Sequence, residues 1–247
     1  MNAAIRYDDG PYPRARIAFL CVANAGLTEG EMHAMAPAGV GLSFGRVPMG
    51  TACTRENLAG MEGGLRDALD SLLPGRRDVD VICYNCTAGS FVIGNDAVRG
   101  LIARTRPDVA ATTLLDGVTA ALAALGARRV AIATAYDAEV NELERRYFES
   151  AGHEVVALQG LALPDDETMN RVSPRFLAEY AAAVDRPEAD AVFISCGALR
   201  STAIIEELEA RLGKPVIGSN QASLWHCLRL AGVQDRIAGY GTLFRQH

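Results

Sequence analysis

Short apolar runs alternate along the chain with longer segments in which apolar residues recur every three or four positions. The short runs predict buried β-strands at Arg16–Val22, Asp80–Tyr84, Arg129–Thr134, Ala191–Ile194 and Pro215–Gly218. The longer segments predict helices at Arg55–Leu73, Gly117–Leu125, Glu139–Ala151, Arg175–Val184, Ala203–Leu212 and Gln221–Leu230. Alternation of this kind is typical of parallel sheets whose two faces are covered by helices.

The order of these elements repeats within the chain, and so do parts of the sequence itself. Three blocks match later blocks in the same order, and the best pair keeps an offset of 110 residues at both ends (190 − 80 and 196 − 86). The matched pairs are Asp80–Cys86 with Asp190–Cys196, Arg16–Ala18 with Arg129–Ala131, and, more weakly, Thr119–Gly126 with Leu224–Gly232. Such an ordered set favours a duplicated lobe over chance and implies pseudo-twofold symmetry.

A chain of 247 residues suits one large α/β domain or two small lobes. We predict an α/β fold of two pseudo-twofold-related lobes, each a parallel sheet flanked by helices in the flavodoxin-like manner. The first lobe is expected to comprise residues 14–115 and 220–247, and the second residues 116–219. Ligands bind at the carboxyl ends of parallel strands, so we expect the active site in the cleft between the lobes. Glu29–Thr54 and Gln159–Val172 match no motif and are expected to be loops that shape the pocket.

Two cysteines stand just past matched strands. Cys86 is followed by the small residues Thr87-Ala88-Gly89-Ser90, and Cys196 by Gly197-Ala198. Small-residue turns that lead into a helix present free backbone N–H groups, which bind carboxylates and lower a nearby thiol pKa. A symmetry-matched pair is therefore predicted to be catalytic. The remaining cysteines have no matched partner and are expected to be packing residues: Cys21, Cys53, Cys83 and Cys227.

Two thiols on opposite sides of one bound molecule suit two related reactions. A thiolate can remove an α-proton while the opposite thiol delivers one, which inverts a stereocentre without a cofactor. Alternatively, a thiolate adds to an activated double bond, the new single bond rotates, and elimination returns the other geometric isomer. In both reactions negative charge grows on a substrate carboxylate, where N–H and hydroxyl donors beside each cysteine would stabilise it.

The charge pattern limits the partners that we expect. A net charge of −6, a pI near 5.3 and the lack of a basic run argue against nucleic-acid binding. The longest apolar run, Val109–Leu125, is interrupted by Asp116 and Gly117, so no membrane span is expected. Met1–Pro13 lacks the basic start and apolar core of a secretory signal, and the cysteine spacing does not suggest disulfides. These features predict a cytoplasmic location.

No cofactor or metal is expected. The glycines Gly39, Gly41 and Gly45 do not form a dinucleotide-binding fingerprint. Lys214 is the only lysine and lies in an apparent helix-to-strand turn, which gives little support to pyridoxal-phosphate chemistry. The four histidines are scattered without ligand spacing: His33, His153, His226 and His247.

With the two cysteines placed, the chain resembles the aspartate/glutamate racemase superfamily, in the branch that holds maleate cis–trans isomerases and arylmalonate decarboxylases. The resemblance covers nearly the whole chain and is densest from Ala121 onward. It rests on Ala124–Ala131, Ala133–Tyr136, Ser195–Leu199, Ser223–Trp225, Leu228–Gly232 and Gly239–Phe244. One departure stands out: the decarboxylases have a glycine where this chain has Cys86, whereas racemases and maleate isomerases have both thiols.

The resemblance also implies substrate-binding roles. Tyr136 stands where the family has a tyrosine that holds a substrate carboxylate, and Thr87 would offer its hydroxyl and N–H to the same group. Ala88 replaces a serine that is frequent there, so one hydroxyl contact would be lost. Asn24 lies close to the substrate-binding asparagine of the isomerases, although the preceding Cys21-Val22-Ala23 lacks their Pro-Ser-Ser character. Further implied binding residues are Asn170, Gly197 and Ala198.

Three functions remain open at this point. The first is a cofactor-independent isomerase that acts on a small carboxylate, with maleate-type cis–trans isomerisation ahead of racemisation of an amino acid or a hydantoin. The second is an arylmalonate-type decarboxylase, favoured by the overall similarity and opposed by Cys86. The third is a non-catalytic carboxylate-binding protein or a thiol redox protein. The family resemblance also implies a homodimer.

Overall fold

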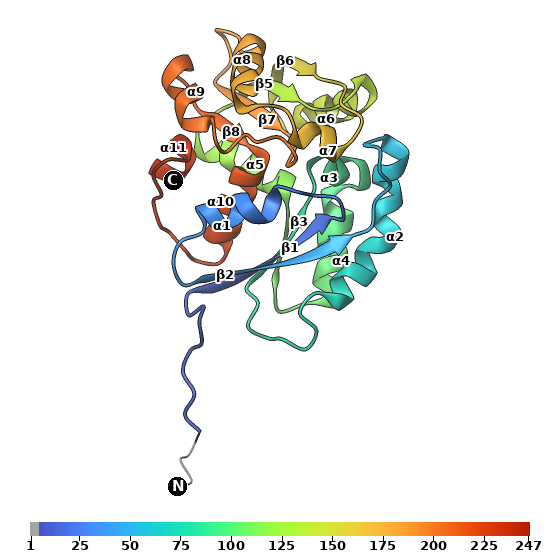
Figure 1. Cartoon of the computed structure of the whole chain (residues 1–247), viewed down its shortest axis with the longest axis vertical. Helices are drawn as coiled ribbons and strands as arrows, with labels where there is room; N and C mark the ends of the chain where they lie inside the picture. Colours follow the sequence, from blue (N-terminus) through green and yellow to red (C-terminus); the bar gives the residue numbers. More distant parts are fainter. Residues whose placement is uncertain (1–4) are drawn as a thin grey trace.

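A computed structural model describes residues 5–247; the first four residues of the Met1–Pro13 segment lie outside the described residues. The chain forms two parallel sheets with helices on their faces (Figure 1), which confirms the predicted fold class. The first sheet contains β1 (Ala15–Val22), β2 (Val40–Val47), β3 (Val81–Asn85) and β4 (Ala110–Thr113). The second contains β5 (Arg129–Thr134), β6 (Glu154–Gly160), β7 (Ala191–Ser195) and β8 (Val216–Gly218).

The two sheets have the same topology, as the internal repeat predicts. The strand orders are β2-β1-β3-β4 and β6-β5-β7-β8, and every pairing is parallel. Cys86 follows β3 and Cys196 follows β7, which are equivalent inner strands of the two sheets. The duplicated fold therefore puts both cysteines at the carboxyl end of a buried strand.

Helices cover the sheets and fill the space between the lobes. The helices up to β5 are α1 (Thr28–Met35), α2 (Arg55–Ser71), α3 (Thr87–Ile93), α4 (Asn95–Thr105) and α5 (Leu114–Ala124). Those after β5 are α6 (Ala138–Ser150), α7 (Asp166–Asn170), α8 (Pro174–Val184), α9 (Ile205–Leu212), α10 (Ser219–Leu230) and α11 (Gly241–Gln246). Within residues 5–247, no helix has the length and apolar character that a membrane span requires.

The helices α5 and α10, which carry the third matched pair of sequence blocks, pack against each other between the sheets (Figure 1). They cross closely at Gly117, where an added Cβ would lie only 2.9 Å from the carbonyl oxygen of Ala222. Apolar side chains of both sheets, such as Phe19 and Phe193, share one buried cluster with these two helices. α11 packs on α9 and β8 of the second sheet. The predicted lobe boundaries remain a prediction.

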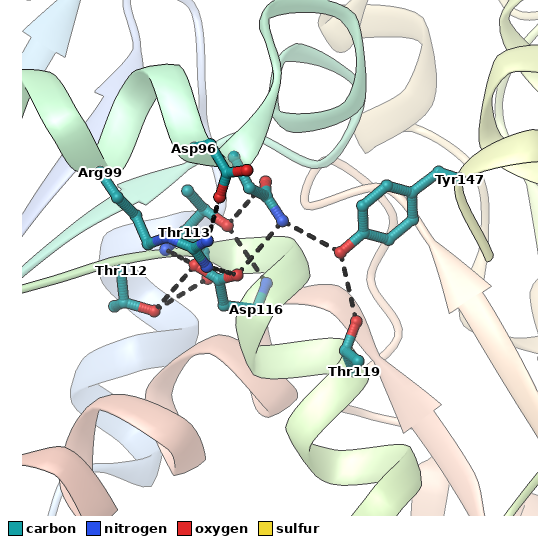
Figure 2. Close-up of polar contacts among 8 residues, drawn as sticks. Asp96, Arg99, Thr112, Thr113, Asp116, Thr119 and Tyr147 are labelled. Atoms are coloured by element: carbon teal, nitrogen blue, oxygen red, sulfur yellow. Dashed lines mark hydrogen bonds and ion pairs between the residues drawn. The ribbon is translucent and has the colours of Figure 1, made fainter. Parts of the chain in front are cut away.

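A polar network on one side of the α5–α10 layer links the lobes (Figure 2). Asn95 at the start of α4 donates to the Tyr147 hydroxyl of α6 over 3.0 Å and to Asp116 over 3.2 Å. The Tyr147 hydroxyl also lies 3.2 Å from the Thr119 hydroxyl of α5. Asp116 belongs to a capping box with Thr113 and pairs with Arg99. Hydrogen bonds from α4, α5 and α6 thus help to fix how the two lobes sit against each other.

The elements that the sequence analysis did not anticipate are mostly edge strands and short helices. The edge strands β2, β4 and β6 were missed, as were α1, α3, α4, α7 and α11. An edge strand such as β2 is half-exposed and contains Gly41, Gly45 and Arg46, so its apolar pattern is weak. The expectation that Glu29–Thr54 and Gln159–Val172 are loops was wrong, since they contain most of α1, all of β2, the end of β6 and α7.

Candidate active site

A small cavity of about 40 Å³ lies between the carboxyl ends of the two sheets. Both lobes contribute to its walls, and most of the lining is apolar or carries a single small polar group. The lining residues are Val22, Ala25, Thr28, Met49, Cys53, Leu58, Asn85, Cys86, Thr87, Ala88, Tyr136, Asp166, Cys196, Gly197 and Ala198.

Cys86 caps the first turn of α3. Its backbone is extended, and its Sγ accepts a hydrogen bond of 3.2 Å from the N–H of Gly89. Ser90 Oγ donates to the Cys86 carbonyl oxygen over 2.6 Å. Gly89 is required here, because an added Cβ would lie 2.2 Å from the Tyr84 hydroxyl and 3.0 Å from Cys86 Sγ. The small residues after Cys86 therefore hold its sulfur at the cavity wall.

Cys196 occupies the equivalent place in the second lobe with a strained backbone. Its φ of +134° falls in a region that side chains with a Cβ rarely adopt. Strain of this kind costs on the order of 1–3 kcal/mol and is concentrated at functional sites. Cys196 Sγ accepts a hydrogen bond of 3.4 Å from the N–H of Ala198 and lies 3.6 Å from the sulfur of Met169.

Ser219 and Asn220, the first residues of α10, join the two cysteine loops beneath the cavity. Ser219 Oγ accepts hydrogen bonds from the Thr87 hydroxyl and from the N–H of Cys196, both over 3.0 Å. Asn220 accepts from the side chain of Asn85 over 3.1 Å and donates to the Gly197 carbonyl over 2.9 Å. These two residues have no sign of this role in the sequence, because nothing in a helix start indicates that it contacts two distant loops.

The structure brings together seven of the nine residues predicted to form the site. Those that line the cavity are Cys86, Thr87, Ala88, Tyr136, Cys196, Gly197 and Ala198. Tyr136 follows β5, is almost fully buried, and packs edge-on against Phe91 of α3 with ring centres 6.3 Å apart. The catalytic and binding roles of these residues remain predictions.

Two predicted binding residues lie outside the cavity lining. Asn24 is exposed, in the turn after β1. Asn170 ends α7, and its side-chain nitrogen lies 2.8 Å from the place where a Cβ on Gly26 would be. The two asparagines thus belong to segments that contact each other beside the cavity. The sequence could place these segments near the site, but it could not show which way each side chain points.

Two of the lining residues that were not anticipated as site residues carry ionisable groups. Cys53 was assigned to packing, yet it borders the cavity from the loop before α2. Asp166 also lines the cavity, and the residue is only 6% exposed. Both residues lie in the segments that match no motif, Glu29–Thr54 and Gln159–Val172. The sequence predicts only that these segments shape the pocket, and not which of their residues line it.

Burial raises the pKa of both candidate catalytic thiols. The pKa of Cys86 rises to about 12, and the Gly89 N–H only partly offsets the loss of water. The pKa of Cys196 rises well above its usual range for the same reason, with a smaller increase from the charge of Asp166; the Ala198 N–H and the Tyr136 hydroxyl oppose the rise. Both groups are therefore neutral thiols at neutral pH.

We accordingly expect iodoacetamide to label Cys86 at pH 7 about a thousandfold more slowly than a free cysteine, and Cys196 also more slowly, because only the thiolate reacts. Since a raised pKa leaves less thiolate, labelling should accelerate about tenfold per pH unit up to at least pH 10. Peptide mass spectrometry after timed labelling measures both rates. Labelling of either thiol at the rate of free cysteine at pH 7 would contradict this description of the site.

Known proteins share both the sequence and the fold of this chain. A profile of the arylmalonate decarboxylase family matches residues 68–244. The arylmalonate decarboxylase of Bordetella bronchiseptica is 38% identical over 136 residues, which span 54% of this chain and 57% of that enzyme. The maleate isomerase of Pseudomonas putida is 27% identical over 173 residues, or 67% of this chain and 69% of that enzyme.

Solved structures agree with these matches over nearly the whole chain. A mutant arylmalonate decarboxylase in a liganded form has a TM-score of 0.82 and 26% identity, with 94% of this chain and 100% of that chain covered. The maleate isomerase from Pseudomonas putida S16 shares the fold with a TM-score of 0.83 at 24% identity, covering 94% and 98% of the two chains. The resemblance to this branch of the racemase superfamily is thereby confirmed, and the chain belongs to the arylmalonate decarboxylase family of enzymes.

Proposed function

We propose that the protein is a cofactor-independent isomerase that uses Cys86 and Cys196 as a pair on one small carboxylate. The observation that carries the proposal is that both thiols border the same cavity from equivalent strands of the two lobes. Under pseudo-twofold symmetry the two thiols would act from opposite sides of a bound molecule. A simple binding site would not need two thiols arranged in this way.

In the proton-transfer form of the reaction, one thiol first loses its proton and the resulting thiolate removes a proton from the substrate carbon. The opposite thiol then donates its proton to the other face, which leaves the first cysteine as a thiol and the second as a thiolate. The electron pair of the broken C–H bond is held meanwhile by the substrate carboxylate. The Thr87 and Tyr136 hydroxyls line the same cavity and are the side-chain donors for this charge.

In the addition form, the thiolate bonds to one carbon of a double bond and the other carbon takes a proton. The opposite thiol supplies that proton. After rotation about the new single bond, the opposite thiolate takes a proton back and the C–S bond breaks, which returns the electron pair to sulfur as a thiolate and restores the double bond in the other geometry. A maleate isomerase from Nocardia farcinica with this fold carries a covalently bound succinylcysteine intermediate. This precedent supports a cysteine of the pair as nucleophile in the present chain.

Decarboxylation of an arylmalonate is the second candidate, and it rests on the family profile and the 38% identity to the Bordetella decarboxylase. That reaction needs one proton donor after loss of carbon dioxide. Cys86 would then be superfluous, although it is held by a hydrogen bond from Gly89 at the cavity wall. The pair of thiols therefore favours isomerisation.

One substrate panel in deuterated buffer, followed by NMR, separates these reactions. The panel contains maleate, aspartate, glutamate, a hydantoin and phenylmalonate. We expect either a change of double-bond geometry or deuterium at the α-carbon of recovered substrate, with no carbon dioxide released. Decarboxylation of phenylmalonate alone, undiminished in a Cys86→Gly variant, would overturn the proposed function.

A further inference from the structure

Asp166 supplies the one carboxylate among the described residues that line the cavity bordered by both thiols. Asp166 is the first residue of α7, and the residue as a whole is only 6% exposed at the cavity wall. It forms no hydrogen bond or ion pair with any of the residues 5–247. The neighbouring Asp165 differs, because its carboxylate caps the helix by accepting from the N–H of Thr168 over 2.8 Å.

The cavity offers this carboxylate no positive charge. The described residues that line it include no lysine, arginine or histidine. A buried ionised group without a partner is unfavourable, so such groups are normally paired. Asp166 has no structural partner to explain its position, whereas a ligand in the cavity would lie directly beside it.

We propose that Asp166 is a specificity-determining residue that receives an ammonium or N–H group of the substrate. The inference rests on the proposed function, in that the cavity between the thiols is taken as the substrate site. The substrate class is then a small carboxylate that carries a nitrogen donor on or next to the reacting carbon. Dicarboxylates, which would bring a second negative charge against Asp166, are selected against.

The same contact would couple substrate binding to thiol activation. The negative charge of Asp166 raises the pKa of Cys86 and of Cys196, in addition to the larger effect of burial. A cationic group bound to Asp166 cancels this contribution and makes thiolate formation easier. A substrate with two negative charges would instead raise the thiol pKa values further. The correct substrate would thus help to ionise the thiol that attacks it.

Two ligands that differ in one substituent test this selectivity. Alanine and methylmalonate both have a methyl group and a carboxylate on one carbon, and they differ in an ammonium against a second carboxylate. We expect NMR titration at pH 7.5 to show at least tenfold tighter binding of alanine by the wild-type protein. In Asp166→Asn this preference should fall at least tenfold, chiefly through tighter binding of methylmalonate.

Asp165→Asn is the matched control, because it removes the same charge one residue away and an asparagine still caps the helix. It should keep the wild-type preference. Asp166→Ser is a second variant at the site, and circular dichroism checks that both site variants fold. Equal binding of alanine and methylmalonate by the wild type, or an unchanged preference in both folded site variants, would overturn the inference.

If Asp166 is protonated instead of ionised, the binding experiment gives a different result. A protonated Asp166 could donate a hydrogen bond to a second carboxylate, and methylmalonate would then bind the wild type as well as it binds Asp166→Asn, which also overturns the inference. The proposed function is judged separately. If maleate is isomerised with both thiols required, the function stands and the role of Asp166 fails. If selectivity depends on Asp166 but thiol variants keep full turnover, the function fails alone.

Discussion

Replacing Cys196 with serine should lower turnover by about a thousandfold or more, and Cys86→Ser should do the same. A serine hydroxyl keeps nearly the same shape, but it ionises far less readily than a thiol and is a poor base or nucleophile at neutral pH. Loss of a proton-transfer group generally reduces rates by about 10²–10⁴-fold. The measurement is kcat on the substrate identified by the panel, with kcat and KM determined separately.

The control for these variants is a buried cysteine away from the cavity. Cys227 lies in α10, is fully buried and does not line the cavity. Cys227→Ala should change kcat by less than about threefold, although it lowers stability somewhat through the small void that it leaves. Full turnover in either Cys86→Ser or Cys196→Ser would remove that thiol from the mechanism.

Replacing Glu144 with leucine should stabilise the protein by about 4 kcal/mol at pH 8. Glu144 is fully buried in α6, neither carboxylate oxygen makes a hydrogen bond of good geometry among the described residues, and the Ser195 hydroxyl offsets only a small part of the burial. Burial raises its pKa from the ordinary 4.5 to about 8. Between these pH values the unfolded chain has lost the proton that the folded protein still holds, so the stability of the wild type falls as pH rises.

The pH dependence identifies the cause of this stabilisation. The difference in unfolding free energy between Glu144→Leu and the wild type should be largest near pH 8 and should shrink by about 1.4 kcal/mol per pH unit towards pH 4.5. Urea unfolding at several pH values measures it. Glu142→Gln, on the exposed side of the same helix where Glu142 pairs with Arg146, should change stability by less than about 0.5 kcal/mol. If the gain in unfolding free energy did not vary with pH, it would come from better packing of leucine and not from the ionisation of Glu144.

The strands at the centre of each sheet were predictable because they are buried on both faces. β1, β3, β5 and β7 read as nearly continuous apolar runs, and the repeat of Asp80–Cys86 at Asp190–Cys196 gave the two-lobed arrangement. Edge strands carry no such signal, as β2 shows. The helix α5 was placed too late in the sequence, because Asp116 looked like an interruption. In the structure the Asp116 carboxylate accepts a hydrogen bond from the N–H of Thr113 within the capping box.

The candidate site was predictable only where symmetry or strand ends marked it. Cys86 and Cys196 stand out in the sequence because they match across the repeat. Asp166 has no equivalent sign, since a lone aspartate after a proline and another aspartate is ordinary at a helix start. Glu144 did leave a sign, because it lies on the buried stripe of α6 between Val140 and Phe148, where an apolar residue would be expected.

The most direct test of the two-thiol account compares the double variant Cys86→Ser/Cys196→Ser with each single variant. Residues that act as one unit are strongly non-additive, because removing either one already disables the shared step. We expect kcat of the double variant to lie within about tenfold of the weaker single variant. If the losses in kcat instead multiplied, so that the double variant fell by the product of the two single effects, the thiols would act independently and the account would be contradicted.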